Sequence, residues 1–396
     1  IGFGDEAWCA LASPPLTALN QNVEKMGQLA VEKLIQKLNG LELEPQIERT
    51  PIHLQIRKST QVIGRGPFGE KAISPEMLTL SSVEVDRLKA GNFKVAISFH
   101  FTGTNWSRLH ETGIRHTLEK YGVRVLTVTD AHFDPALQVT QLDGIRMQNP
   151  DAIIAIPVDD KATAKKFKEI SKSALLVFIS TIPDGFQKDD YASCISVNEE
   201  ENGQNAGMIL GQFFKNRGQV KIGMINHGAP FHGTQLRDMM AEQMIRDSFP
   251  NIEIVAIDHF YEITRAYDVC KQMMTQHPDI EGLYISWDRP ALEAIKALKE
   301  LNREDVSIVT FDLDEEISRY LANGTMVRGL STQRPYEQGV AVALATAKAL
   351  LGNDPYKYIG VEPLQVLPRN LLKAWREINH EPAPKEIEDT VNNKFT

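Results

Sequence analysis

The sequence has few cysteines and no long apolar run, and each shortage excludes a class of protein. Its three cysteines, Cys9, Cys194 and Cys270, are scattered over 396 residues. An odd and widely spaced set gives no disulfide framework and is typical of buried free thiols in a reducing compartment. No apolar run reaches the roughly 18 residues that a transmembrane helix needs, so we expect no membrane insertion.

Positive charge and catalytic or metal-binding motifs are also scarce. The chain carries 43 Lys and Arg against 52 Asp and Glu, a net charge of −9, and shows no basic stripe that could grip a phosphate backbone. It contains no HExxH, CxxC or GxSxG motif, and the spacing of His227 and His232 fits neither one helix face nor a zinc knuckle. We therefore predict no metal, no cofactor and no enzymatic activity.

One glycine-rich stretch imitates a nucleotide-binding fingerprint. Gly64, Gly66 and Gly69 spell G-x-G-x-x-G, but no helix opens directly after them. Pro67 also stands where a backbone N–H group should face a phosphate. We interpret the stretch as part of a linker.

The chain does contain a segment that occurs twice. Residues 20–40 and 332–352 align without a gap, with Gly27 on Gly339, and a short strand with an acidic turn precedes each copy. A long series of strands and helices comes before the second copy, whereas almost nothing comes before the first. We infer that the chain is the downstream part of a longer polypeptide, cut inside a first domain and carrying a complete second one.

From Phe93 onward, short apolar runs alternate with amphipathic helices. Residues 151–160, DAIIAIPVDD, form a nearly continuous apolar run, which is typical of a strand covered on both faces. Strands that alternate with helices predict parallel sheets, and about ten strands suit two similar lobes with a ligand cleft between them. The predicted fold class is therefore α/β, with two doubly wound parallel-sheet lobes preceded by an incomplete α/β remnant of the same fold.

Polar residues follow several of the predicted strands, at the point where each strand ends. Because the carboxyl ends of parallel strands face one crevice, these side chains could converge on one ligand. Carboxylates, an arginine fork and an amide are the groups that hold a polyol, each charged hydrogen bond contributing about 1.5–3 kcal/mol. Capping of a helix start is the alternative for any single aspartate. The candidates are Asp159, Arg237, Asp288, Asp312 and Gln333.

Aromatic residues lie beside these polar positions. Flat rings could cover the apolar C–H faces of a pyranose, although filling the core is the ordinary alternative. The aromatic residues in question are Phe101, Trp106, Phe231, Trp287 and Phe311, and of these Trp106 and Trp287 join the candidate ligand-binding residues.

Residues 93–382 resemble the type I periplasmic-binding-protein family, in its ribose-binding-like branch. The most specific segments are GLSTQRPYEQGVA (329–341) and PLQVLPRNLLKAWREI (363–378), supported by HGAPFHGTQLRD (227–238) and TFDLDEEI (310–317). The resemblance implies two lobes joined by crossing segments near residues 197, 312 and 362, which close on a sugar by hinge motion. It implies ligand contacts from Trp106, Asp159, Arg237, Asp312 and Gln333, while Trp287 and Asp288 stand where relatives often carry Asn-Asp.

Residues 1–60 resemble the closing part of a lac-repressor-family regulator. The matching segments are IGFGD, PPLTALNQNVEKMGQLAVEKLIQKLNG and HLQIRKST. The effector-binding domain of that family shares the same fold, which would explain the internal repeat. Sugar-binding relatives usually carry Asp at the position of Gly4, so a sugar acid is a candidate effector for this cut domain.

These observations divide the chain into four parts. We predict the end of a first effector-binding domain at 1–60, a linker at 61–92, a complete two-lobed sugar-binding domain at 93–382 and a tail at 383–396. The helix predicted at 22–38 has lost the sheet that its apolar face would cover, so an exposed apolar patch is expected there.

Two functions remain open, both with a sugar or sugar derivative as ligand. The first is the ligand-sensing part of a lac-repressor-like transcription regulator in the cytoplasm, which would contact DNA only through a missing upstream helix-turn-helix and could be a homodimer. The second is the periplasmic solute-binding component of a sugar importer. A repressor-type tail runs through a short linker into the receptor with no export signal between them, and this favours the regulator.

Overall fold

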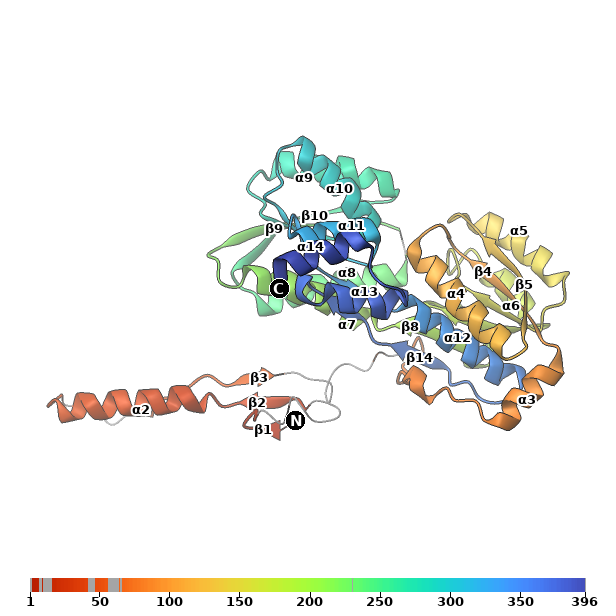
Figure 1. The fold of residues 1–396 in the computed structure, drawn as a ribbon, viewed down its shortest axis with the longest axis horizontal. Helices are drawn as coiled ribbons and strands as arrows, with labels where there is room; N and C mark the ends of the chain where they lie inside the picture. Colours follow the sequence, from red (N-terminus) through yellow and green to blue (C-terminus); the bar gives the residue numbers. More distant parts are fainter. Residues whose placement is uncertain are drawn as a thin grey trace. The chain divides into compact units, whose positions relative to one another are not determined.

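The computed structural model describes residues 2–6, 9, 16–41, 47–55, 64, 66–229 and 231–395. The chain divides into two compact units, Ile1–Ile63 and Gly64–Thr396. The larger unit contains two six-stranded sheets, and each sheet with its helices forms one lobe (Figure 1). This confirms the predicted α/β fold of two doubly wound lobes.

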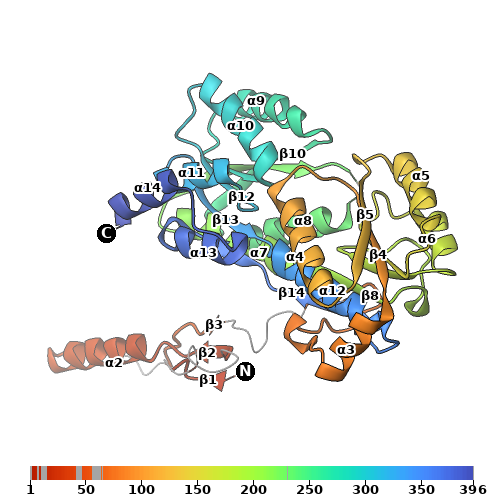
Figure 2. The ribbon, with the colours of Figure 1, turned by 45° about the vertical axis from the view of Figure 1, so that its right-hand side comes forward.

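The first lobe is built on a sheet in the order β14-β8-β7-β6-β4-β5, in which all neighbours are parallel. Helices α4 and α12 cover one face of it and α5 and α6 the other (Figure 2). All of β6 is buried, as a strand covered on both faces should be. The elements are β4 (Lys94–Phe99), α4 (Asn105–Lys120), β5 (Arg124–Asp130), α5 (Pro135–Arg146), β6 (Ala152–Ala155), α6 (Ala164–Ile170), β7 (Leu175–Ile179), β8 (Ser193–Val197), α12 (Pro335–Leu350) and β14 (Tyr358–Val361).

The second lobe has the sheet order β10-β9-β11-β12-β13-β15, in which only β15 runs antiparallel to its neighbour. Its elements are α7 (Glu199–Phe214), β9 (Val220–His227), α8 (His232–Ser248), β10 (Ile252–Phe260), α9 (Ala266–Gln276), β11 (Gly282–Ile285), α10 (Asp288–Glu300), β12 (Ser307–Phe311), α11 (Glu315–Asn323), β13 (Val327–Thr332), β15 (Leu364–Val366), α13 (Leu371–Asn379) and α14 (Lys385–Phe395). Short 3-10 helices also occur in the larger unit, in both lobes and in the segment before them. They are η1 (Pro75–Met77), η2 (Lys188–Asp190), η3 (Ile263–Arg265) and η4 (Pro368–Asn370).

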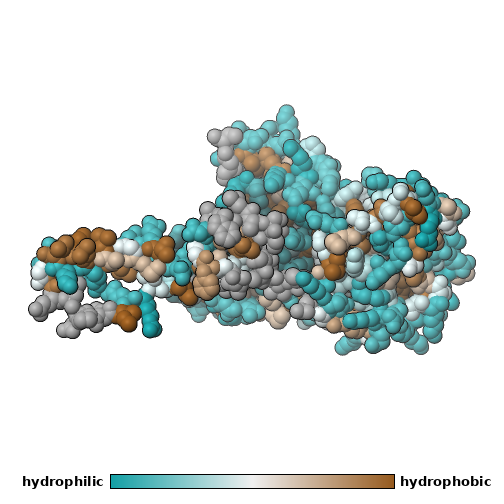
Figure 3. Space-filling view, turned by 90° about the horizontal axis from the view of Figure 1, so that it is seen from below, coloured by the Kyte–Doolittle hydropathy of each residue, from teal (hydrophilic) through white to brown (hydrophobic). Residues whose placement is uncertain are grey.

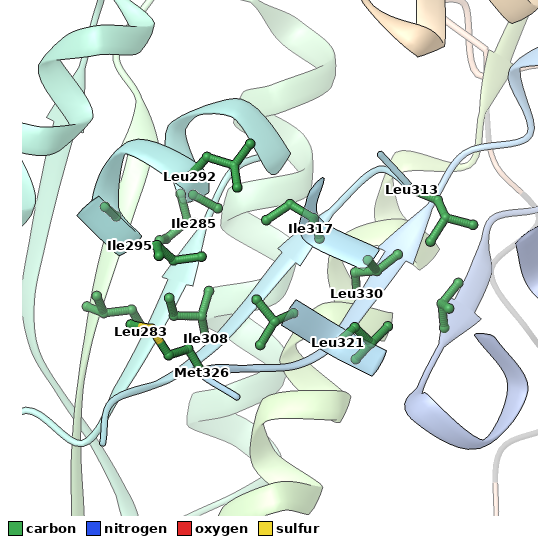
Figure 4. Close-up of a cluster of buried hydrophobic side chains, with 14 of the residues drawn as sticks. Leu283, Ile285, Leu292, Ile295, Ile308, Leu313, Ile317, Leu321, Met326 and Leu330 are labelled. Atoms are coloured by element: carbon green, nitrogen blue, oxygen red, sulfur yellow. The ribbon is translucent and has the colours of Figure 1, made fainter. Parts of the chain in front are cut away.

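The core of the second lobe lies between this sheet and the helices that follow its strands. Leu283 and Ile285 of β11 lie among Leu292 of α10 and Ile317 and Leu321 of α11 (Figure 4), and all five are buried. Burying such side chains contributes about 1.5–3 kcal/mol each. This packing fixes the strand ends from which the candidate polar groups project.

Within the described residues, three segments of the chain cross between the lobes. The chain passes from β8 to α7 at 197–199, from β13 to α12 at 332–335, and from β14 to β15 at 361–364. The predicted crossings near 197 and 362 agree with this arrangement, but the one near 312 is wrong. Residue 312 lies between β12 and β13, which pair within the second sheet, so the chain stays in the second lobe there.

The stretches predicted as linker and tail contain ordered elements that contact the two lobes. Helix α3 (Ser82–Gly91) contributes Leu88 to the first-lobe core, and its Glu84 lies 3.1 Å from Lys348 of α12. At the other end of the chain, α14 contributes Ile387 and Val391 to the second-lobe core. The domain boundaries drawn from the sequence stay predictions.

The smaller unit reproduces the edge of the second sheet together with the helix that follows it. Strands β1 (Gly2–Phe3), β2 (Ala18–Asn20) and β3 (His53–Gln55) form a sheet in which β1 is parallel and β3 antiparallel to β2. The same directions join β12, β13 and β15. Helix α2 (Val23–Leu38) aligns end for end with α12. This confirms the internal repeat; of the strand expected at 52–60, residues 56–60 lie outside the described residues.

Helix α2 exposes its apolar side chains, whereas most residues on one face of its counterpart α12 are buried. No residue of α2 is buried, and Val23, Leu34 and Leu38 are each more than half exposed. Figure 3 shows hydrophobic residues gathered along this helix. In α12 the corresponding face packs on the first-lobe sheet and on α4.

Candidate ligand-binding site

The turns after the second-lobe strands place polar groups at one edge of the sheet. Asp312 follows β12 directly and adopts a left-handed backbone with φ of 63°, a conformation that aspartate tolerates better than most residues. Its N–H donates to the carbonyl oxygen of Ser331 at 3.1 Å, which fixes the turn. Asp288 opens α10 just after β11, and Gln333 follows β13.

Arg237 is the central cation of this edge. It lies on α8, is only 3% exposed, and its guanidinium carbon is 4.4 Å from the centre of the Phe311 ring. Its Nη1 atom is 3.8 Å from Oε2 of Glu199 on α7. Within the described residues neither Nε nor Nη1 has a hydrogen-bond partner. A buried planar fork with spare donors is suited to bidentate contact with a ligand.

Two of the predicted carboxylates lie within electrostatic range of each other. Burial raises the pKa of Asp288 well above its usual value, and repulsion from Asp312 adds to the effect. Burial likewise raises the pKa of Asp312, while attraction to Arg237 opposes the rise. The Oδ1 atom of Asp312 is buried without a hydrogen-bond partner among the described residues. The structure therefore brings Arg237, Asp288 and Asp312 together.

Several other polar residues of this edge were not predicted from the sequence as ligand contacts. Asn226, at the end of β9, is 8% exposed, and its Oδ1 has no partner within the part of the chain that is described. Asp238 accepts hydrogen bonds from Tyr284 at 2.6 Å and from Ser286 at 2.8 Å. Asn226 ends an apolar strand, a signal that could have found it. Asp238 and Glu199 lie inside helices and carry no such signal.

Trp287 belongs to an aromatic group beside these residues. Its ring centre is 4.9 Å from that of His227 and 4.9 Å from that of Phe260, both edge-on. Burial, with repulsion from Arg237, lowers the pKa of His227 to about 4, so this imidazole is neutral at pH 7. Phe311, by contrast, is fully buried beneath Arg237 and supports the guanidinium.

The first lobe contributes aromatic and imidazole groups. Trp106 lies in the first turn of α4, with its ring centre 5.8 Å from that of His100. The indole Nε1 and the His100 Nδ1 are both buried without a hydrogen-bond partner within the described residues. Phe231 of the second lobe reaches the same cluster, its ring centre 5.4 Å from His100. The two lobes therefore meet at this aromatic cluster.

A polar chain joins the second crossing segment to Trp106. The Nε2 atom of Gln338 donates to Oε1 of Gln333 at 3.4 Å, and Oε1 of Gln338 is 2.8 Å from Nε2 of His110. The other ring nitrogen of His110 is 3.0 Å from the carbonyl oxygen of Trp106. Gln333, a predicted ligand contact, is thus tied to the first lobe as well as to β13.

Asp159 fits the ordinary alternative, helix capping. Its Oδ1 accepts the backbone N–H groups of Lys161 at 2.9 Å and Ala162 at 2.7 Å, at the turn before α6. The next residue, Asp160, interacts electrostatically with the second lobe through His232. Burial raises the pKa of Asp160 to about 6, although Thr181 donates a hydrogen bond to it at 3.0 Å.

Other candidate sites receive no support from the described residues. Two surface depressions lie at the opposite, amino-terminal edge of the first sheet, one lined by Phe93 and Asp151 and the other by Leu175 and Tyr191. No group of three or more His, Cys, Asp or Glu side chains is arranged to hold a metal ion in the part of the chain that is described. Within the same residues no helix has the length and apolarity needed to cross a membrane.

Acid is expected to destabilise the larger unit because its core keeps histidines neutral. Burial lowers the pKa of His110 to about 4 and that of His100 to about 3. In the unfolded chain histidine takes up a proton near pH 6.5. Between about pH 6.5 and 4 the unfolded state therefore binds more protons, and the free energy of unfolding falls as the pH is lowered. Urea unfolding at a series of pH values measures the slope.

Two variants isolate the contribution of the buried imidazole. His110→Gln removes one titrating group and should make the pH dependence of the unfolding free energy shallower. His259→Gln changes an exposed histidine and should leave the slope unchanged. An unchanged slope in His110→Gln would show that His110 titrates normally in the folded protein.

Comparison with known proteins agrees with this architecture. Residues 95–354 match the profile of the periplasmic binding protein domain, and residues 1–60 match that of the periplasmic binding protein-like domain. The chain therefore belongs to the periplasmic binding protein family, a family of solute-binding proteins and not of enzymes. Both resemblances of fold inferred from the sequence, for residues 93–382 and for residues 1–60, are confirmed.

The individual relatives are distant. The chain is 23% identical over 244 residues to the ABC transporter periplasmic-binding protein YphF of Escherichia coli strain K12, covering 60% of this chain and 74% of the relative. It is 22% identical over 241 residues to the ribose import binding protein RbsB of Salmonella typhimurium, covering 61% and 79%. A solute binding protein from Agrobacterium radiobacter, solved with D-arabinose, has a TM-score of 0.64 at 20% identity, covering 76% of this chain and 99% of that chain.

Proposed function

We propose that the larger unit binds a sugar or a related polyol between its lobes and acts as the solute-binding component of an importer. The observation that carries the proposal is a set of buried polar atoms without partners among the described residues. They come from both lobes and are atoms of His100, Trp106, Asn226, Arg237 and Asp312. An unpaired buried polar group costs about 1–3 kcal/mol, so a hydroxylated ligand that paired with several of them would be bound firmly.

Within this proposal we assign a role to each site residue predicted from the sequence. Arg237, Asp288, Asp312 and Trp287 would form the second-lobe wall, Trp106 the first-lobe wall, and Gln333 the link at the second crossing. Asp159 would act through its turn, with Asp160 as the group that faces the second lobe. Because the contacts come from both lobes, a ligand would favour the closed arrangement, and the crossings would serve as the hinge.

The importer is favoured over the regulator by the named relatives. Those reported above are binding proteins of transporters. A xylitol-binding protein of Mycolicibacterium smegmatis, 24% identical over 254 residues, extends the set to a sugar alcohol. The regulator remains a second candidate because residues 1–60 match a second domain of the same kind. The sequence of the gene around these residues decides between them: an export signal supports the importer, and a helix-turn-helix supports the regulator.

Ligand binding is expected to change the fluorescence of Trp106 and Trp287, which lie on opposite walls. The measurement is a titration of the full chain with pentoses, hexoses, inositols and sugar alcohols, repeated by calorimetry. Trp106→Phe keeps a ring but removes the unpaired Nε1 atom, so the affinity should fall by about 3- to 30-fold. Trp375→Phe changes an indole in the second-lobe core and should leave the affinity unchanged. Absence of binding by every compound would refute the proposed function.

A further inference from the structure

The second-lobe wall contains more negative than positive charge. Among the described residues of this wall, three carboxyl groups, those of Glu199, Asp238 and Asp312, interact electrostatically with the one buried cation, Arg237, and a fourth, that of Asp288, interacts with Asp312. Arg289 also acts on Asp288, but it is 41% exposed and lies 3.5 Å from Asp314, so water and that partner weaken its effect. If all four carboxyls were ionised, the wall would carry a net negative charge in a region that water barely reaches.

Two of the four carboxyl groups, those of Asp238 and Glu199, accept hydrogen bonds from neighbouring side chains. Asp238 accepts from Tyr284 and Ser286. Glu199 accepts from Asn202 at 3.0 Å and lies against Arg237. Their negative charge therefore belongs to the framework that holds the arginine in place.

Asp288 and Asp312 are less well compensated. Asp288 accepts the N–H of Arg289 at 2.7 Å, and Asp312 has an oxygen without a hydrogen-bond partner in the described part of the chain. Their mutual repulsion raises the pKa of Asp288 further above the value that burial gives. Two buried carboxylates that repel each other are stabilised by a proton or by a cation placed between them.

Unpaired donors and acceptors of other kinds occur at the same edge of the sheet as the acidic pair. Arg237 is 3% exposed and Asn226 is 8% exposed, yet both have polar atoms without partners among the described residues. Hydroxyl groups could pair with these atoms, whereas a carboxylate or phosphate would meet Asp288 and Asp312. In the first lobe Asp160 adds a further carboxyl on the side that faces His232.

We infer that the ligand is a cationic polyol, a hydroxylated molecule with an ammonium group placed against Asp288 and Asp312. The inference rests on the proposed function and narrows its ligand class. The hydroxyl groups would contact Arg237, Asn226 and Trp106, and the ammonium group would form charge-assisted hydrogen bonds with the acidic pair. The same charge pattern disfavours sugar acids and sugar phosphates.

The test compares matched compounds that differ in one substituent. The sugars or polyols that bind in the titration described above are measured again beside their amino-deoxy analogues and the corresponding acids, for example glucose, glucosamine and glucuronate. We expect an amine to bind at least about tenfold more tightly than its hydroxyl parent, and the acid to bind more weakly than either. If no compound of any class binds, the proposed function and the inference fail together. If the neutral parent or the acid binds as tightly as the amine, only the inference is overturned.

Two variants test which residues give the preference. Asp288→Asn and Asp312→Asn each remove one carboxylate, and either should reduce the ratio of amine to parent affinity several-fold. The ratio is the readout because it cancels a general loss of affinity, and urea unfolding shows whether each variant is folded. Asp247→Asn removes an exposed carboxylate of α8 and should keep the ratio. A ratio that stays the same in both site variants contradicts the assignment.

Discussion

Replacing Arg237 with alanine is expected to weaken ligand binding by about 2–5 kcal/mol, which corresponds to a loss of affinity of about 30-fold to several thousand-fold. The change removes a buried fork with two nitrogens that have no hydrogen-bond partner among the described residues. It also leaves Glu199 and Asp312 facing each other without the cation between them. Calorimetric titration with the best ligand of the panel measures the loss.

Two further substitutions separate binding from stability. Arg246 lies on the same helix and is exposed, and its partner is Glu242 at 2.8 Å, so the effect of Arg246→Ala should stay within about 0.5 kcal/mol. Arg237→Lys keeps the charge but loses the planar fork, and should bind more weakly than the parent while unfolding at a similar urea concentration. Parental affinity in Arg237→Ala would remove Arg237 from the site.

The alternation of strands and helices could be predicted because apolar periodicity is a local property. The sequence does not predict β8, whose five residues are all buried but include Ser193, Cys194 and Ser196. Small polar side chains hide a core strand from any reading of hydrophobic runs. The predicted crossing near 312 is wrong for another reason. Whether the chain crosses to the other lobe after β12 depends on which sheet the next strand joins, and the residues of the turn do not reveal this.

The presence of polar groups at the strand ends could be predicted from the sequence, but the role of each residue could not. Asp312 and Asp288 follow apolar strands, and parallel pairing brings such ends to one edge. The roles of the adjacent Asp159 and Asp160 could not be predicted from the sequence. The geometry of the turn decides that Asp159 caps the helix and that Asp160 interacts electrostatically with His232 of the second lobe. Glu199 has no distinguishing signal either, since acidic residues are common in the first turn of any helix.

Gly339→Ala should destabilise the larger unit by several kcal/mol. The partner of Gly339 in the internal repeat, Gly27, provides a matched control. A Cβ atom at Gly339 would lie 2.5 Å from the carbonyl oxygen of His110 and 3.2 Å from Cα of Gly113. These are backbone atoms of α4 that cannot move independently, so the clash outweighs the gain of about 1 kcal/mol that alanine brings to a helix. The urea midpoint of the larger unit should fall clearly.

Gly27→Ala is the control, because Gly27 is the repeat partner of Gly339. A Cβ atom at Gly27 meets no atom within 4 Å among the described residues, so only the gain in helix propensity remains. Hydrogen exchange of residues 23–38 should slow in this variant, whereas the larger unit should unfold at the parental urea concentration. The Gly339 clash also pushes on the turn of α4 that follows Trp106, so ligand affinity should fall with stability in that variant alone. Equal stability of the two variants would mean that α4 and α12 are not held at the close approach that positions Trp106.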